Sequence, residues 1–139
     1  MNARSLGVAA LLPVASCLPG GVSLTPGIRL YDGPELPPSA VALIENDPNM
    51  YLASVDGRSL RRRAHSHNVL TVQVLPGKHM IVAGPSARAG FVSVDAARIE
   101  FIAEAGHRYV VSRRIVGGSN SAKWTPVFTD VTTGKELVP

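Results

Sequence analysis

The residue of this chain whose side chain is most clearly suited to chemistry is Cys17, its only cysteine. A single cysteine cannot form an internal disulfide, so its thiol is left for metal ligation, nucleophilic attack or covalent modification. The residues before it form a secretion-signal pattern, with a positive charge at Arg4 and an apolar run from Leu6 to Ala15. That run is shorter than the roughly twenty apolar residues of a membrane-spanning helix. We therefore expect residues 1–16 to be a signal peptide.

The four residues Val14, Ala15, Ser16 and Cys17 resemble the lipobox of bacterial lipoproteins. In that class a peptidase that needs small side chains cuts before the cysteine, whose thiol carries a diacylglycerol. A further acyl chain makes the anchoring stable, because one chain alone binds a bilayer only reversibly. The resemblance implies that Cys17 is lipidated, with palmitate among the acyl groups, and that a membrane is a partner. The alternative is a secreted protein cut after Ala15 or Ser16, with a free thiol in an oxidising compartment.

The residues after the cysteine indicate a location and a tether. By resemblance to lipoprotein sorting in Gram-negative bacteria, Leu18 in place of an aspartate favours the outer membrane, with the protein facing the periplasm. Residues 17–27 are rich in proline, glycine and serine, which is typical of a flexible connection. The sequence therefore predicts a lipidated tether over 17–27 and a single domain over 28–139.

The composition of the chain favours an all-β fold for that domain. Thirteen glycines and eleven prolines accompany 45% hydrophobic residues, which indicates many turns between short apolar runs. Strand patterns are expected at 28–31, 39–45, 50–55, 69–75, 78–83, 91–94, 97–103, 107–115 and 123–129, with a short tail at 136–138. This spacing predicts a single small β-sandwich or open barrel of about eight short antiparallel strands, without a substantial helix.

Two turn signals stand out within this domain. Asp56-Gly57 is typical of a tight turn that closes the strand at 50–55. Pro76-Gly77 fits the centre of a type II turn, which would make residues 69–75 and 78–83 the two strands of a hairpin.

Around these turns, the stretches SVDGR and VLPGKHMIV resemble hairpins of small bacterial envelope β-domains of the PEGA type. The wider chain is similar to a family of uncharacterised proteobacterial lipoproteins through LYDGPELP, AEAGHRYVV and DVTTGKEL. The latter resemblance implies a compact β-domain on a lipid anchor and supplies no catalytic residue.

The densest charge cluster consists of Arg58, Arg61, Arg62 and Arg63. Guanidinium groups match phosphates and carboxylates, so this cluster predicts a patch for an anionic envelope component or an envelope protein. The alternative is an ordinary solvated loop. A net charge of +4 and 5% aromatic residues do not favour a nucleic-acid partner.

Three histidines allow a metal-binding alternative. His65 and His67 would lie on one side of a strand, and His79 could complete a three-nitrogen site. The simpler interpretation of His79 is a ring that bonds a loop carbonyl beside the Pro76-Gly77 corner.

Catalytic templates do not fit the sequence. It holds neither the nucleophile elbow Gly-x-Ser-x-Gly nor a complete P-loop. Glu100 and Glu104 would lie about 13 Å apart on one strand face, too far for a glycosidase pair, so we expect them to solubilise an outer face. The sequence therefore predicts a binding or envelope-structural module without catalytic residues, cofactor or metal. The alternatives are a small envelope hydrolase or metal-binding protein using His65, His67 and His79, and a carrier with a cavity between its sheets.

Overall fold

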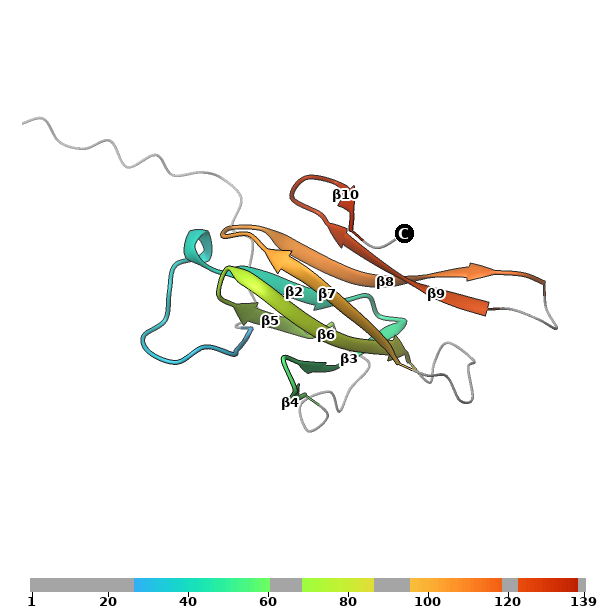
Figure 1. Ribbon diagram of the computed structural model, residues 1–139, viewed down its shortest axis with the longest axis horizontal. Helices are drawn as coiled ribbons and strands as arrows, with labels where there is room; N and C mark the ends of the chain where they lie inside the picture. Colours follow the sequence, from blue (N-terminus) through green and yellow to red (C-terminus); the bar gives the residue numbers. More distant parts are fainter. Residues whose placement is uncertain (1–26, 61–68, 87–95, 119–122, 138–139) are drawn as a thin grey trace, which may run out of the picture.

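The computed structural model describes residues 27–60, 69–86, 96–118 and 123–137 (Figure 1). Within these ranges the chain forms ten short strands and one 3-10 turn, which confirms the all-β prediction. The elements are β1 (Ile28–Arg29), η1 (Pro38–Ala40), β2 (Ala42–Asn46), β3 (Met50–Val55), β4 (Arg58–Ser59), β5 (Thr71–Val74), β6 (Gly77–Pro85), β7 (Ala97–Ala103), β8 (Arg108–Val116), β9 (Lys123–Asp130) and β10 (Lys135–Glu136). The strand expected at 91–94 lies outside the described residues.

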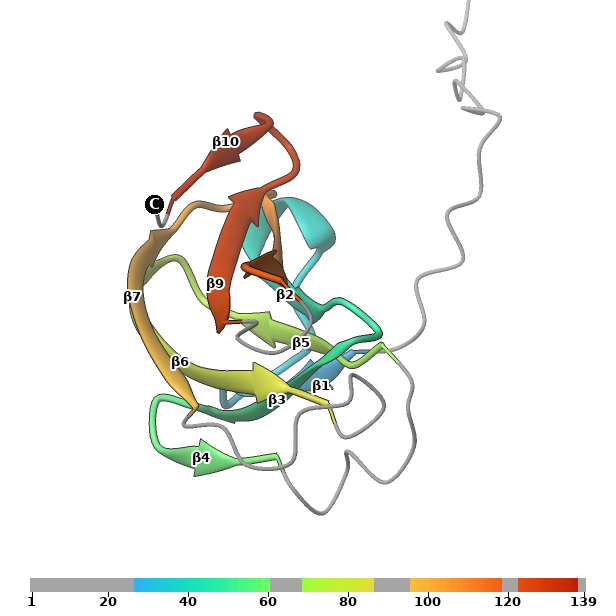
Figure 2. The ribbon, with the colours of Figure 1, turned by 90° about the vertical axis from the view of Figure 1, so that its right-hand side faces the viewer.

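The strands form two sheets that face each other (Figure 2). The larger sheet has the order β1-β5-β2-β8-β9-β10, and the smaller has the order β4-β3-β6-β7. Neither sheet closes on itself, so the fold is a sandwich and not a closed barrel. Most neighbours are antiparallel as expected, but β1 pairs with β5 and β2 with β8 in parallel. The chain leaves the larger sheet after β2 and returns to it through the smaller one, which allows β2 and β8 to run in the same direction.

The hairpin expected at Pro76-Gly77 is absent, and that prediction is wrong. β5 pairs with β1 and β2 in the larger sheet, whereas β6 pairs with β3 and β7 in the smaller one. The corner therefore carries the chain from one sheet to the other. Gly77 does adopt the expected positive φ, at +128°. Strands on either side of a corner show the same alternation whether they share a sheet or face each other across the core.

The Asp56-Gly57 turn is confirmed. Val55 pairs with Arg58, so only these two residues connect β3 to β4. Both have positive φ, +49° and +78°, which is the type I′ arrangement that matches the twist of the flanking strands.

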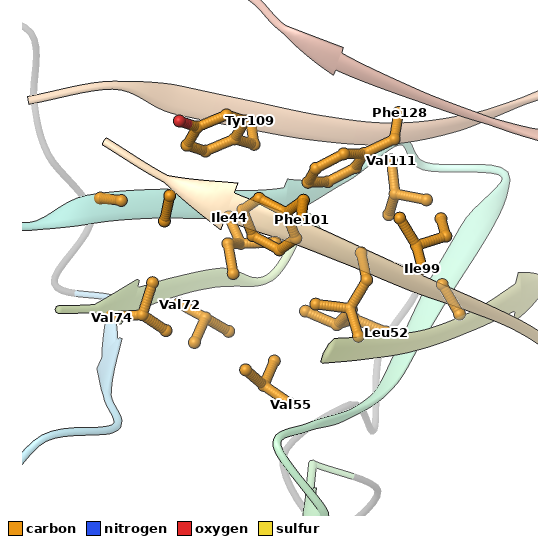
Figure 3. Close-up of a cluster of buried hydrophobic side chains, with 14 of the residues drawn as sticks. Ile44, Leu52, Val55, Val72, Val74, Ile99, Phe101, Tyr109, Val111 and Phe128 are labelled. Carbon is orange, nitrogen blue, oxygen red and sulfur yellow. The ribbon is translucent and has the colours of Figure 1, made fainter. Parts of the chain in front are cut away.

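Side chains from both sheets fill the space between them (Figure 3). Phe101 of the smaller sheet lies with its ring centroid 4.6 Å from that of Phe128 and 5.1 Å from that of Tyr109, both in the larger sheet. Such aromatic pairs add roughly 0.5–1.5 kcal/mol each to the stabilisation from burial alone. The three rings therefore join the two layers.

Alternation of apolar residues in the sequence predicts one buried face for each strand; this holds for β5 and β7 and is shifted by one residue in β2. Val72 and Val74 are buried in β5, as are Ile99, Phe101 and Ala103 in β7. In β2, however, Ala42 and Ile44 enter the core, while Leu43 is only partly buried. Burial does alternate along β2, but on the other set of residues, because Val41 is buried just before the strand begins and Ala42 starts the face that enters the core.

Candidate functional site

The site begins at the turn between β7 and β8. Glu104 follows the last residue of β7, and His107 precedes the first residue of β8. Gly106, with φ +78°, allows the chain to turn between them, and its N–H donates to the carbonyl of Val41 at 2.8 Å. The pairing of Tyr109 with Asp130 brings the end of β9 to the same place.

Three side chains lie in contact there. His107 Nδ1 lies 2.7 Å from Asp130 Oδ2, and its Nε2 lies 3.3 Å from Glu104 Oε2. The other oxygen of Asp130 accepts the backbone N–H groups of Thr132 at 3.0 Å and Thr133 at 3.4 Å. Exposure of the side chains rises from 7% at Asp130 through 21% at His107 to 65% at Glu104. A fixed, buried carboxylate therefore orients an imidazole whose other nitrogen lies close to a solvent-exposed carboxylate.

The surroundings shift the pKa of Asp130 and that of the adjacent Tyr109. Burial raises the pKa of Asp130, but the hydrogen bonds from His107 and from the turn N–H groups outweigh it and hold this pKa below its usual value. Burial raises the pKa of Tyr109, and the nearby carboxylates of Asp130 and Glu104 raise it as well. The backbone N–H of Glu104 donates to the phenol oxygen of Tyr109 and lowers this pKa, but by less than the total increase. At neutral pH the site thus holds an ionised Asp130 beside a neutral phenol.

A groove of about 450 Å³ opens next to this group of side chains. Its lining comes from β7, β8, the end of β9 and the β10 region: Ile102, Glu104, Tyr109, Asp130, Thr133, Lys135 and Leu137. Ile102 is 72% exposed, which leaves one side of the groove apolar and accessible. The described lining presents carboxylates, one amine and hydroxyls.

His79 forms a second cluster, at the corner between β5 and β6. Its Nε2 lies 2.6 Å from the carbonyl oxygen of Leu75, which confirms the prediction that this ring bonds a loop carbonyl. Its Nδ1 lies 2.6 Å from Asp56 Oδ2, and Asp56 Oδ1 accepts the backbone N–H of Met80 at 2.8 Å. The Asp-Gly turn and the Pro-Gly corner are thus joined through one carboxylate and one ring. His79 would have to give up one of these bonds to bind a metal, and the other two histidines of that hypothesis, His65 and His67, lie outside the described residues.

The environment of Asp56 also changes its titration. Burial raises the pKa of Asp56. The hydrogen bonds from His79 and from the Met80 N–H lower it, the charges of His79 and Arg58 lower it by smaller amounts, and together these effects outweigh that of burial. The net pKa of Asp56 lies below its usual value.

Of the predicted arginine patch, the structure describes Arg58 in β4. Its guanidinium donates to the carbonyl oxygen of Leu30 at 3.2 Å, beside the end of β1. Arg29 directly precedes Leu30, and its guanidinium carbon lies 5.6 Å from the ring centroid of Tyr31. Arg61, Arg62 and Arg63 lie outside the described residues, as does Cys17.

Sequence reasoning missed the group formed by Glu104, His107 and Asp130. It placed Glu104 with Glu100 on an outer face, and both side chains are exposed, but Glu100 pairs with Lys78 at 3.4 Å whereas Glu104 contacts His107. A glutamate three residues before a histidine is a weak local signal. The third member lies 23 residues further on and is reached only through the pairing of β8 with β9.

Comparison with protein-family models, with curated proteins and with solved structures finds no match for this chain. The resemblance to lipoproteins and to PEGA-type hairpins therefore stays a prediction from the residues themselves. In the part of the chain that the structure describes, no helix has the length and hydropathy needed to cross a bilayer.

Proposed function

We propose that this protein is a lipoprotein of the bacterial outer membrane, anchored through Cys17, whose periplasmic β-sandwich binds an anionic component of the envelope. The observation that carries the proposal is the sequence Val14-Ala15-Ser16-Cys17 at the end of an apolar segment. The first described residue, Gly27, follows ten residues after the cysteine, and β1 begins directly after it. The order of signal, attachment point, tether and domain is the one expected of a lipid-anchored module.

The length of the tether determines how far the domain can move from the bilayer. Ten extended residues span at most about 35 Å. A flexible coil of this length has an average end-to-end distance of roughly 17 Å. The domain would therefore stay within about one domain diameter of the membrane, close enough for its basic side chains to meet envelope anions.

The position of Arg58 supports a role for the arginine cluster. Its bond to Leu30 holds it beside β1, the strand that the tether enters. Arg29 belongs to β1 itself and is exposed. Guanidinium groups at this end of the domain would face the anchored side, where phosphates and carboxylates of the envelope are concentrated.

Membrane fractionation tests the anchor. The wild-type protein is expected in the membrane fraction with incorporated palmitate, and Cys17→Ser in the soluble fraction without it. Ser16→Ala is a matched control, because it keeps a small residue before the cut and leaves the thiol in place. A Cys17→Ser protein that still sediments with membranes would contradict the anchor.

Vesicle sedimentation tests the patch separately. Full-length protein is expected to bind vesicles containing phosphatidylglycerol more tightly than neutral vesicles, and added salt should weaken that binding. Changing Arg58, Arg61, Arg62 and Arg63 to glutamine should remove the difference between the vesicles. Unchanged binding in this variant would show that the cluster is only a solvated loop.

A further inference from the structure

We propose that Glu104 and His107 form a binding site for a divalent transition-metal ion such as Zn²⁺, with Asp130 orienting the imidazole. One possible ligand atom from each of these three residues lies within 4.8 Å of the other two. This site is separate from the three-histidine hypothesis made from the sequence, and it does not depend on the lipid anchor.

The distance between the two ligand atoms fits a tetrahedral ion. His107 Nε2 and Glu104 Oε2 lie 3.3 Å apart. Two bonds of about 2.1 Å at the tetrahedral angle place their ligand atoms roughly 3.4 Å apart. The separation of these two atoms is therefore that of two ligands of one Zn²⁺ ion.

Asp130 has the position of an orienting group and not of a ligand. It is buried, it contacts His107 Nδ1 at 2.7 Å, and its other oxygen is occupied by two backbone N–H groups. A carboxylate on one imidazole nitrogen fixes the tautomer in which the other nitrogen presents its lone pair, and it raises the basicity of that nitrogen. The metal-facing nitrogen of His107 is then Nε2, the one that lies 3.3 Å from Glu104 Oε2.

The surroundings of Glu104 supply the rest of the coordination shell. Its side chain is 65% exposed, and the adjacent groove of about 450 Å³ has room for water molecules as the remaining ligands. Lys135 lines the same groove, and its positive charge opposes a bound cation. With two protein ligands and this opposing charge, we expect an exchangeable site and not a permanently occupied structural one.

The competing interpretation is an imidazolium that bridges two carboxylates and binds no metal. Isothermal titration of Zn²⁺ into the full-length protein at neutral pH distinguishes the two. We expect His107→Gln and Glu104→Gln each to weaken binding at least tenfold, and Asp130→Asn to weaken it about 10- to 100-fold. Glu100→Gln is the matched control, since this exposed carboxylate on β7 pairs with Lys78 and should leave Zn²⁺ affinity within twofold of wild type.

Two further variants keep the test decisive. Glu104→His replaces one ligand by another in an exposed position and is expected to retain binding, which a general loss of structure would not allow. The double variant His65→Gln/His67→Gln should bind Zn²⁺ like the wild type. The proposal would be overturned if Glu104→Gln and His107→Gln bound Zn²⁺ as tightly as the wild type, or if the His65/His67 variant alone lost binding.

Discussion

His79 is held at both ring nitrogens, and this makes it a structural residue of the corner between β5 and β6. Its side chain is only 14% exposed, and its partners come from two separate turns. Its type suggested a metal ligand, but its neighbours use both nitrogens. A histidine beside a tight turn is thus better judged by the acceptors that the turn provides than by the presence of other histidines.

Replacing this ring should destabilise the domain. His79→Ala leaves the Leu75 carbonyl and the Asp56 carboxylate without their shared donor, and we expect it to lower the free energy of unfolding by roughly 1–3 kcal/mol. Urea unfolding followed by the fluorescence of Trp124, the only tryptophan, measures the effect. Lys78→Ala is the neighbouring control, since its exposed pair with Glu100 should contribute less than about 1 kcal/mol. Equal stability of the two variants would contradict this role of His79.

The lowered pKa of Asp56 predicts a specific loss of stability in acid. A carboxylate whose pKa is lower in the folded than in the unfolded state stabilises the fold above its unfolded value, near 3.9. That contribution disappears as the pH falls through the lower folded value. Asp56→Asn removes the charge but keeps a residue that tolerates the positive φ of +49°.

The stability of Asp56→Asn should therefore fall less than that of the wild type between about pH 5 and pH 2. Urea unfolding across this range gives the comparison. Parallel pH profiles for the two proteins would show that the Asp56 contacts do not favour the ionised carboxylate.

Among the elements, the local ones were predictable and the choice of sheet was not. The Asp56-Gly57 turn follows from two adjacent residues that accept positive φ, and the buried face of β7 follows from simple alternation. The corner at Pro76-Gly77 shows the limit, because Val74 and Ile81 both point into the core and would do so in either arrangement. Which sheet a strand joins depends on pairings with distant strands, and the metal-site geometry depends on one of these, β8 with β9.

The corner itself can be tested at Gly77. Gly77→Ala meets no neighbouring atom within 4 Å, but it forces a side chain to adopt a φ of +128°. We expect a loss of about 1–2 kcal/mol in stability.

Gly118→Ala is the matched control for Gly77→Ala, since Gly118 also has open space but no positive φ, and its replacement should be neutral or slightly stabilising. A similar change in the free energy of unfolding at both positions, measured in urea, would mean that the positive φ of Gly77 does not contribute to the stability of the corner.

At the scale of the whole molecule, the two sheets depend on a few large side chains between them. Phe101→Ala removes the ring that contacts Tyr109 and Phe128, and we expect it to lower the free energy of unfolding by roughly 3–5 kcal/mol. The next residue, Ile102, is 72% exposed on the opposite face of β7, so Ile102→Ala should change stability by less than about 0.5 kcal/mol. Urea unfolding of this adjacent pair tests whether the core lies between the sheets as described.

The arrangement of the sheets also separates the two proposed surfaces. Arg29 in β1 and Arg58 in β4 belong to one edge of each sheet. The groove beside Glu104 is lined in part from β7 and the β10 region. These two strands form the opposite edge of each sheet (Figure 2). In an anchored molecule whose tether enters at β1, the basic edge would face the membrane, and the proposed metal site would face away from it.

The most direct test of this account is the mass of the N-terminal peptide from protein extracted from membranes. Attachment through Cys17 predicts that the chain begins at this residue and carries a thioether-linked diacylglycerol, with an additional acyl group on its amine. A chain that begins at residue 16 or 17 with an unmodified Cys17 thiol, or that retains residues 1–16, would contradict the lipid anchor and with it the proposed place of this domain in the envelope.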